Sequence, residues 1–598
     1  MKKNLLLLAL LSCVTLAQTS CTKKSTGTTA FTVCIASKPQ TIDPALNTTA
    51  DGGTYDVHLF EGLYKWSYEG TYPNGKVSLV PGLAKEAPKR TANDNGTVTY
   101  TYTLRDDAKW SNGEKLTAND VERSWKRAVS KAVAADYAYL FEAIVGGADA
   151  EGETDGHSLS VKATSETTLT VDLVTDVPYW NELTAFPAFA PVYKTADVEG
   201  NWASIENSAH FICNGPMKIK EYNDSKIEMV PNEHYTGTSV VNATDITFAF
   251  SDDDSAMLNS YKSGSYAFID SFPNDQIEQI KNQYTKEYFN VGQLGTYYVC
   301  WNINDPTLTG NEHLKNETDR EKFRNAVSKL INRQYLIDTV AKGGQAPATG
   351  FVASGLLDAD GQTDWTKKNG PNQDGSGYYD VSTANYATQA ATAVEEIKSL
   401  GFNYDENEKK FTDAPTLKYL TNNGSGHEAI AQYLQAELGK YGISVAIESQ
   451  EWATFISTRK AGDYSVARNG WLCDYNDPIS MLDMFITDSG NNDVQFGKGA
   501  NATYNGYSVD VNGDGTIAED EKNLTWAQSF DKLISNIKVT TDTTKRYKMM
   551  HDAETMLMST GCITPLYYYT DFFLKKENMN GFFSSPLGYK FFYGAKLD

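Results

Sequence analysis

The stretch YTYTLRDDAKWSNGEKLTANDV, residues 100–121, carries the most information about the fold class of this chain. From Thr97 to Leu104, apolar or aromatic residues alternate with threonine, which predicts a half-exposed β-strand. Thr117 and Asp120 have the spacing of a helix N-cap and of a carboxylate that reaches back to it. We therefore predict a strand, a turn and a capped helix, and we interpret this block as structural rather than ligand-binding.

Strand and helix patterns alternate along the rest of the chain, without a repeat of fixed period. Gly401 follows an alanine-rich helical pattern, as glycine often does just past a helix end. The expected elements are strands at 31–35, 444–448 and 464–468, and helices at 387–400, 427–438 and near Trp452. This alternation indicates an α/β protein with a mixed sheet, and 598 residues exceed a single hydrophobic core.

The chain is strongly acidic, with 53 lysine and arginine residues against 76 aspartate and glutamate residues and a formal net charge of −23. Nucleic acid is an improbable partner, because its binding depends on clustered basic side chains that release phosphate counterions. The acidic balance favours solubility and says little about the fold.

The N-terminus has the pattern of an export signal. Lys2 and Lys3 precede an apolar run from Leu5 to Ala17. The following residues, LAQTSC at 16–21, resemble a lipoprotein signal with Cys21 as the acylated residue, whereas ordinary cleavage without a lipid is the alternative. We expect a signal peptide at 1–20, a lipid-anchored tether at 21–30, and a periplasmic or cell-surface location.

Beyond the signal, the sequence has no run of about 18 apolar residues, so we expect the lipid to be the only membrane attachment. Five cysteines remain after processing, and they lack the CxxC spacing of metal cages. An exported protein can form disulfides, but the sequence does not reveal a pairing. These cysteines are Cys34, Cys213, Cys300, Cys473 and Cys562.

A second segment, RNGWLCDYNDP at 468–478, places Arg468, Trp471 and Asp474 within seven residues. A cation, an aromatic ring and a carboxylate suit a peptide, which has an ammonium at one end and a carboxylate at the other. Six extended residues cover at most about 20 Å, and a peptide of three to five residues needs roughly 10–17 Å, so one segment could hold both ends. A surface pair or an internal salt bridge is the alternative.

Together the two segments resemble the peptide- and nickel-type solute-binding proteins that feed ABC importers, and the second is most similar to the oligopeptide-binding members. The resemblance extends from about Phe31 to the C-terminus. Further matching pieces are Pro178-Tyr179, NGP at 214–216, YKSG at 261–264, Glu451-Trp452 and PLYYY at 565–569.

The resemblance implies an α/β clamshell of the class II-like periplasmic binding protein type with an extra third domain, known as cluster C. Lobe I would combine residues 31–60, 194–295 and 571–598. Lobe II would be an insertion at 61–193, and lobe III would comprise 296–570. Lobes I and III would close over the ligand by hinge bending.

The resemblance also implies ligand-binding roles for charged residues. Asp474 matches the family carboxylate that receives the peptide ammonium, and Arg468 matches a guanidinium that meets the carboxylate end. His427 matches a histidine near that end, and its place in a first helical turn favours a neutral ring. Lys342 lies one position from a lysine that binds the carboxylate of longer peptides.

Aromatic and main-chain groups would complete the site. Trp471 and Trp452 would form walls of side-chain pockets, with Tyr297 and Trp301 as weaker candidates, although each is as compatible with an ordinary core position. The main chain of Gly470 and Leu472 would pair with the peptide backbone, as in strand addition.

The chain departs from the pattern of the oligopeptide-binding proteins that it resembles at two positions. Thr48 stands where those relatives carry a cleft glutamate, and Cys300 stands at another acidic position. Because fewer acids would surround the site, the resemblance does not imply a preference for basic peptides.

Residues 510–521, DVNGDGTIAEDE, match the EF-hand calcium loop position by position. Asp510, Asn512 and Asp514 supply oxygens at positions 1, 3 and 5, Thr516 supplies a carbonyl at position 7, and Glu521 stands at position 12. An exit helix is expected near 524–537, whereas 501–508 is too rich in glycine and asparagine for an entering helix. The sequence predicts an inserted structural Ca²⁺ site, with a plain acidic loop as the alternative.

The most plausible function is therefore capture of short peptides for the permease and ATPase subunits of an ABC importer, by a monomer without catalytic activity or catalytic cofactor. Dipeptides, nickel complexes and other small solutes compete as ligands. An exported hydrolase is the alternative from another class, but the sequence has neither a GxSxG elbow nor an HExxH motif.

Overall fold

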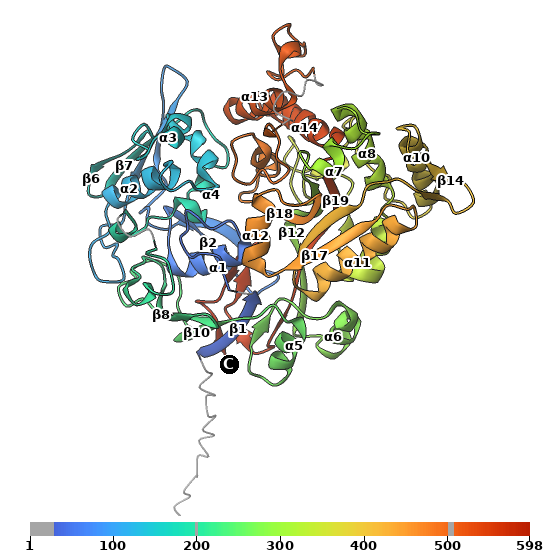
Figure 1. The fold of residues 1–598 in the computed structure, drawn as a ribbon. Helices are drawn as coiled ribbons and strands as arrows, with labels where there is room; N and C mark the ends of the chain where they lie inside the picture. Colours follow the sequence, from blue (N-terminus) through green and yellow to red (C-terminus); the bar gives the residue numbers. More distant parts are fainter. Residues whose placement is uncertain (1–28, 37, 198–200, 500–507) are drawn as a thin grey trace, which may run out of the picture.

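The computed structural model describes residues 29–36, 38–197, 201–499 and 508–598. The predicted signal peptide, Cys21 and most of the predicted tether lie outside these residues. Figure 1 shows three bodies: one on the left around β6, β7 and α2, one on the right around α8, α10 and α11, and a lower one around β1, β10 and α5.

Eleven strands of the described residues form one mixed sheet. β1 pairs in parallel with β10, and β16 pairs in parallel with β17 and β18. In spatial order the strands are β17 (Val445–Gln450), β16 (Leu417–Asn422), β18 (Val466–Leu472), β12 (Tyr288–Trp301), β19 (Ile563–Lys575), β11 (Phe268–Ile269), β1 (Ala30–Ala36), β10 (Asp245–Phe250), β9 (Lys226–Pro231) and β8 (Met217–Asn223), with β13 (Ala346–Pro347) also paired to β19.

The two longest strands, β12 and β19, lie side by side in the middle of this sheet. On one side of them are the strands of predicted lobe III, and on the other are those of predicted lobe I. Their antiparallel pairing is irregular between Gly292 and Thr296. A break in register bends a strand pair locally, so this is the place where a hinge between the two lobes is expected. The lobe boundaries themselves stay a prediction.

Lobe II contains a sheet in the order β4-β5-β7-β6, formed by β4 (Lys89–Ala92), β5 (Val98–Thr103), β7 (Thr168–Leu173) and β6 (Val161–Ser165). Helix α2 (Ala118–Val129) packs against β6, and the Thr117 N–H donates to the Asp120 carboxylate at 2.9 Å. Trp110 and Trp125 are buried in the core. The predicted strand, capped helix and structural role of this block are confirmed.

The main helices are α1 (Ala50–Leu59), α5 (Asp254–Lys262), α8 (Glu317–Lys329), α10 (Tyr386–Lys398), α11 (Ser425–Gly439), α12 (Trp452–Lys460), α13 (Trp526–Val539) and α14 (Thr543–Ser559). Shorter ones are α3 (Gly147–Gly152), α4 (Trp180–Leu183), α6 (Ile277–Gln283), α7 (Pro306–Thr309) and α9 (Arg333–Tyr335). Two-stranded pairs are β2 (Tyr64–Glu69) with β3 (Lys76–Pro81), β14 (Tyr404–Asp405) with β15 (Lys410–Phe411), β20 (Met579–Asn580) with β23 (Lys596–Leu597), and β21 (Phe583–Ser584) with β22 (Lys590–Phe591).

The predicted elements around the second segment are present, with one difference that bears on the site. The helices at 387–400, 427–438 and near Trp452 correspond to α10, α11 and α12. The strand expected to end at Arg468 instead continues to Leu472, because β12 pairs with it from Val466 to Leu472. Arg468, Gly470, Trp471 and Leu472 therefore stand on a rigid strand, and Asp474 follows two residues after its end.

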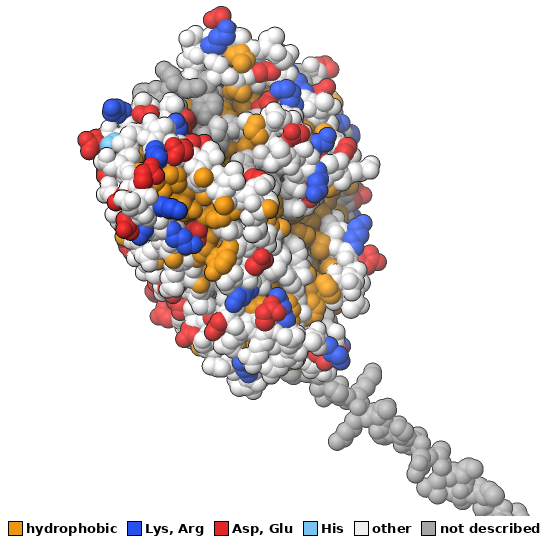
Figure 2. All heavy atoms as spheres, turned by 90° about the vertical axis from the view of Figure 1, so that its right-hand side faces the viewer, with side chains coloured by type: hydrophobic (Ala, Val, Ile, Leu, Met, Phe, Trp, Pro, Cys, Tyr) orange, Lys and Arg blue, Asp and Glu red, His pale blue; other side chains and the backbone are white. Residues whose placement is uncertain are grey.

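Four of the five cysteines, Cys213, Cys300, Cys473 and Cys562, are buried free thiols, and Cys34 is also buried. The disulfides that the sequence allowed are not formed by these four residues. None of the described helices combines the length and the apolar character needed to cross a bilayer. On the face shown in Figure 2, lysine and arginine side chains are scattered among acidic ones rather than gathered in one basic area.

Candidate functional site

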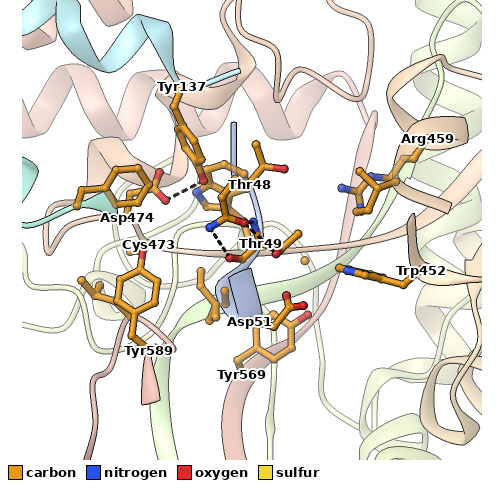
Figure 3. A pocket seen from close by; sticks show the side chains of 18 of the residues that line it. Thr48, Thr49, Asp51, Tyr137, Trp452, Arg459, Cys473, Asp474, Tyr569 and Tyr589 are labelled. Atoms are coloured by element: carbon orange, nitrogen blue, oxygen red, sulfur yellow. Dashed lines mark hydrogen bonds between the residues drawn. The ribbon is translucent and has the colours of Figure 1, made fainter. Parts of the chain in front are cut away.

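A cavity of about 280 Å³ contains both charged residues that the sequence singled out. Its walls come from segments that are far apart in the chain. They include Thr48, Tyr137, Trp452, Arg468, Asp474 and Tyr589. Figure 3 shows Asp474 and Tyr137 on one side of this cavity and Trp452 with Arg459 on the other. The cavity therefore has separated regions of opposite charge.

Strand β18 presents one face to the cavity. Arg468, Gly470 and Leu472 are partly exposed, whereas the residues between them are buried. This alternation follows from the two-residue period of a strand. A Cβ atom at Gly470 would collide with the Tyr569 hydroxyl oxygen, so a larger residue there would require the Tyr569 side chain to shift.

The outer edge of β18 has no described strand beside it beyond its first two residues. β16 pairs with β18 only at Val466 and Ala467. The Cys473 N–H donates to the Leu294 carbonyl on the β12 side, so by alternation the N–H groups of Gly470 and Leu472 face the opposite edge. The Gly470 N–H donates to the Asn469 side chain at 2.8 Å. The Gly470 N–H thus already has a side-chain partner, and the pairing of Gly470 and Leu472 with a peptide backbone stays a prediction.

Asp474 is a buried carboxylate with one oxygen left over. Tyr137 donates a hydrogen bond of 3.0 Å to Oδ1, and the Asp474 N–H donates to Ser480 Oγ at 2.8 Å. Its Oδ2 is buried and has no hydrogen-bond partner among the described residues. Burial raises the pKa of Asp474 well above its usual value, and the negative charge of Asp483 adds to the effect. An ammonium group would supply the missing partner.

Arg468 is half-buried and contacts three ring-bearing side chains. Its Nη2 donates to His427 Nε2 at 3.1 Å, and the guanidinium lies over the rings of Tyr297 and Trp452, 5.5 Å from each centroid. Within the described residues, neither Arg468 nor Asp474 forms an ion pair, so the alternative of a salt bridge between them is wrong. The positive charge of Arg468 is available to a ligand carboxylate.

His427 stands in the first turn of α11, as predicted, and its tautomer follows from its partners. Arginine only donates hydrogen bonds, so Nε2 accepts from Arg468 and Nδ1 carries the proton, 3.2 Å from the Tyr297 oxygen. Burial lowers the pKa of His427 well below its usual value, and the Arg468 charge lowers it further. The ring is therefore neutral. Burial and the Arg468 charge favour the neutral form, as the positive end of the helix dipole was expected to do. The neutral ring orients the Arg468 guanidinium through its hydrogen bond.

The aromatic candidates divide between cavity and core. Trp452, at the start of α12, lines the cavity, and Trp471 lines it while donating from Nε1 to the Ser480 carbonyl at 2.7 Å. Tyr297 is fully buried beneath Arg468. Trp301 lies in the core of lobe III and donates to Thr564 at 3.2 Å.

The remaining sequence candidates lie in different surroundings. Thr48 lines the cavity. Cys300 is buried in the sheet, where Asn469 donates to its sulfur. Lys342 has a positive φ of 56° after a π-helical turn and lines neither this cavity nor the one that adjoins it. Its role stays a prediction.

The cavity residues that escaped the sequence reasoning include Tyr137, Arg459 and Asp51. Tyr137 comes from lobe II, and no local pattern marks it. Arg459 lines the cavity near Trp452, but its Nε lies 2.9 Å from Asp493, so its charge is already balanced. Asp51 stands in the first turn of α1, where an acidic residue reads as ordinary helix stabilisation. Long-range packing alone brings them to the cavity.

Lobe II covers the cavity through contacts with lobe III. The rings of Tyr179 and Tyr475 stack with centroids 4.2 Å apart, and the Asn476 N–H donates to Glu182 at 2.6 Å. A further ion pair joins Lys538 to Glu142 at 2.7 Å. These contacts join the predicted lobes II and III beside the cavity.

The loop at 510–521 has several features of a cation site. Gly513 and Gly515 have positive φ angles, and the N–H of Gly515 donates to Asp510 at 2.8 Å. Asp510 and Glu521 are buried, yet neither forms an ion pair with a described residue. Buried carboxylates without a cationic partner are costly, so these oxygens fit a hard cation such as Ca²⁺.

Two further observations define the loop. Its acidic side chains do not all come within 4.8 Å of one another; in the described part of the chain only the surface trio Glu153, Asp155 and His157 does so. Glu521 accepts from the Ala518 N–H at 2.7 Å, so cation binding would draw Glu521 inward. The exit helix exists as α13, two residues later than predicted, and most of 501–508 lies outside the described residues.

Comparisons with known proteins agree with this architecture. A family profile, "Bacterial extracellular solute-binding proteins, family 5 Middle", matches residues 78–493. The Oligopeptide-binding protein OppA of Bacillus subtilis is 26% identical over 584 residues, which cover 96% of this chain and 93% of that protein. The Periplasmic murein peptide-binding protein MppA of Escherichia coli is 27% identical, covering 92% of this chain and 89% of that protein.

A solved structure, Listeria monocytogenes OppA bound to peptide, superposes with a TM-score of 0.76 at 25% identity, covering 96% of this chain and 99% of that one. These similarities confirm the α/β clamshell with an extra domain that the sequence predicted. The chain belongs to the bacterial extracellular solute-binding proteins of family 5.

Proposed function

We propose that this protein captures short oligopeptides by their two termini and delivers them to the permease and ATPase subunits of an ABC importer. One observation carries the proposal: a single cavity contains a buried carboxylate oxygen without a partner, on Asp474, and a guanidinium without a counter-ion among the described residues, on Arg468. A zwitterionic ligand placed between them would satisfy both groups.

The relatives support peptides over other solutes. The Bacillus subtilis protein is named oligopeptide-binding, the Escherichia coli protein murein peptide-binding, and the Listeria structure is described as bound to peptide. A second Bacillus subtilis relative is named dipeptide-binding, so dipeptides are the alternative ligand. A second cavity adjoins the first, and this extra space favours ligands longer than two residues.

The proposed export route is a lipoprotein with an acyl chain on Cys21, which would hold a monomeric receptor near its importer. Metabolic labelling with a radioactive fatty acid tests this point, with Cys21→Ser as the unlabelled control. Labelling of the Cys21→Ser variant to the same extent would reject Cys21 as the lipid site.

The loop at 510–521 is proposed to hold a structural Ca²⁺. Asp510, Asn512, Asp514 and Glu521 would supply side-chain oxygens and Thr516 its carbonyl, and the ion would supply the positive charge that the two buried carboxylates lack. The loop packs on α13, where Asn536 donates to the Val511 carbonyl at 2.8 Å. Calcium would therefore stabilise the loop and α13 rather than take part in ligand binding.

Native mass spectrometry of the purified protein tests the peptide proposal directly. Ligands that co-purify, or that bind from a defined peptide mixture, should be short peptides recovered intact. A non-peptide ligand at the site would contradict peptide capture. Cleaved peptides would favour the alternative of an exported hydrolase.

A further inference from the structure

A second cavity of about 360 Å³ adjoins the first, with Trp452 and Arg468 in the walls of both. It lies between predicted lobes I and III, and its walls carry five carboxylates but only two cationic side chains. The acidic residues are Asp51, Asp252, Asp254, Asp270 and Asp571, and the cationic ones are Arg468 and Lys590.

Lys590 is the cation that faces most of this negative charge. Its Nζ lies 3.2 Å from Asp270 and 3.4 Å from Asp571, and its side chain is buried. Asp51 also lines the cavity and interacts electrostatically with Lys590. One lysine therefore interacts with three carboxylates, and its single positive charge cannot balance all of them.

Two carboxylate oxygens in these walls have no hydrogen-bond donor in the part of the chain that the structure describes. They are Oδ2 of Asp571, a residue only 7% exposed, and Oδ2 of Asp51. Asp254 differs, because it accepts from Ser271 and from the N–H of Ser425. Burying a carboxylate oxygen without a donor is unfavourable unless a cation or donor arrives with the ligand.

The titration of a neighbouring group agrees with this shortage of positive charge. Burial raises the pKa of Asp270 to about 7, and the negative charge of Asp571 contributes to the shift, although Lys590 opposes it. A carboxyl group that takes up a proton near neutral pH indicates an environment in which one more cation would be stabilised.

We propose that the second cavity binds a cationic side chain, an ammonium or guanidinium group, of a residue near the C-terminal end of the bound peptide. Asp51 and Asp571 are its acceptors. The inference rests on the proposed function, because Asp474 at the ammonium end lines only the first cavity, whereas Arg468 at the carboxylate end lines both.

This specificity differs from what the sequence suggested. The absence of acids at Thr48 and Cys300 argued against a preference for basic peptides. The two proposed acceptors in the second cavity, Asp51 and Asp571, come instead from α1 and from β19, segments that meet only in the folded protein. The proposed preference for a cationic side chain therefore depends on this tertiary contact.

Isothermal titration calorimetry with two pairs of tripeptides tests the proposal. In the first pair the C-terminal residue is either lysine or norleucine. In the second pair the N-terminal residue is either lysine or norleucine. All other residues are alanine. Lysine should bind at least about tenfold more tightly than norleucine at the C-terminal position, the size expected for a hydrogen bond to a charged group. No lysine preference, or an equal preference at the N-terminal position, would overturn the proposal.

Two isosteric variants locate the acceptors. Asp51→Asn and Asp571→Asn should each reduce the C-terminal lysine preference, the ratio of the affinities for the lysine and norleucine peptides, severalfold. Asp51 is more than 4 Å from any cationic nitrogen described, so Asp51→Asn leaves the ion pairs of Lys590 intact. This variant therefore still tests the proposal if Asp571→Asn fails to fold. Asp224→Asn, on an exposed loop, is the matched control that should keep the preference.

The outcomes separate the two proposals. If the tripeptides bind without a lysine preference, or if the preference survives in both Asp51→Asn and Asp571→Asn, the assignment of the second cavity is wrong and peptide capture stands. If none of the four tripeptides binds while the protein melts cooperatively, peptide capture itself is rejected and the second-cavity proposal with it.

Discussion

Tyr137 of lobe II donates a hydrogen bond of 3.0 Å to one carboxylate oxygen of Asp474 in lobe III, and this contact leaves the other oxygen buried in the cavity wall. The tyrosine thus fixes the orientation of the carboxylate and connects the two lobes. The free oxygen is ready for a ligand cation. Ligand affinity and the stability of the ligand-free protein should therefore respond in opposite directions to changes at Asp474.

The variant Asp474→Asn should lose peptide affinity by about 2 kcal/mol or more, because a buried ammonium loses its counter-ion. The same variant should melt at a higher temperature than the wild type when ligand-free at pH 7. The pKa of Asp474 is higher in the folded protein than in the unfolded chain, so this group destabilises the fold increasingly as pH rises above the ordinary aspartate pKa. Calorimetric titration and thermal unfolding measure the two effects.

The control for that experiment is Asp483→Asn. Burial raises the pKa of Asp483 to about 6, but this residue lines neither cavity. Its substitution should change peptide affinity little. Unchanged affinity in Asp474→Asn would remove Asp474 from the binding site, and with it the main argument for capture of the peptide ammonium.

Peptide binding at pH 6 should release protons. Burial holds the pKa of Asp474 well above its usual value in the ligand-free protein, and an ammonium beside the carboxylate would lower it, so binding should release part of a proton from this group. The peptide α-amino group, with a pKa of about 7.7–8.0, is already protonated at pH 6 and contributes no uptake. Affinity should accordingly weaken as pH falls.

Calorimetry in two buffers that differ in ionisation enthalpy gives the number of protons released. Asp474→Asn should release fewer than the wild type. Proton uptake by the wild-type protein at this pH would contradict the assignment of the raised pKa to the ammonium site.

Arg468→Gln should abolish discrimination between a free peptide and its C-terminal amide. In the wild type, the guanidinium gains a charge-assisted hydrogen bond only from the free carboxylate, which should favour it by about 1.5–3 kcal/mol. The amide binds both proteins through the remaining contacts and is the internal control. If Arg468→Gln still prefers the free acid to the same degree, another residue receives the peptide carboxylate.

Calcium should raise the melting temperature of protein that has been treated with a chelator. Binding to the folded state alone stabilises by about 2.7 kcal/mol when the free ion is at 100 times its dissociation constant. Glu521→Gln should lose most of this shift, whereas Glu519→Gln, an exposed neighbour, should keep it. Identical melting curves with and without calcium for the wild type would show that residues 510–521 form a plain acidic loop.

Local patterns determined a large part of this protein. The cap formed by Thr117 and Asp120, the helices α10 and α11, and the placement of Arg468 and Asp474 on one short segment all follow from residues near one another in the chain. Such features depend on hydrogen bonds and periodicities that a short window contains. The resemblance to solute-binding proteins rested on the same windows.

The environment of each charge was decided only by the tertiary structure. Whether Arg468 and Asp474 pair with each other or face a cavity depends on β12, which extends β18 to Leu472, and on Tyr137, which approaches from another lobe. Asp51 of α1 and Asp571 of β19 meet around Lys590 of β22, because α1 packs against β22 and the Lys590 ammonium reaches Asp571. Burial and charge balance are properties of these long-range contacts, and they set pKa values and ligand preference, so no local pattern reveals them.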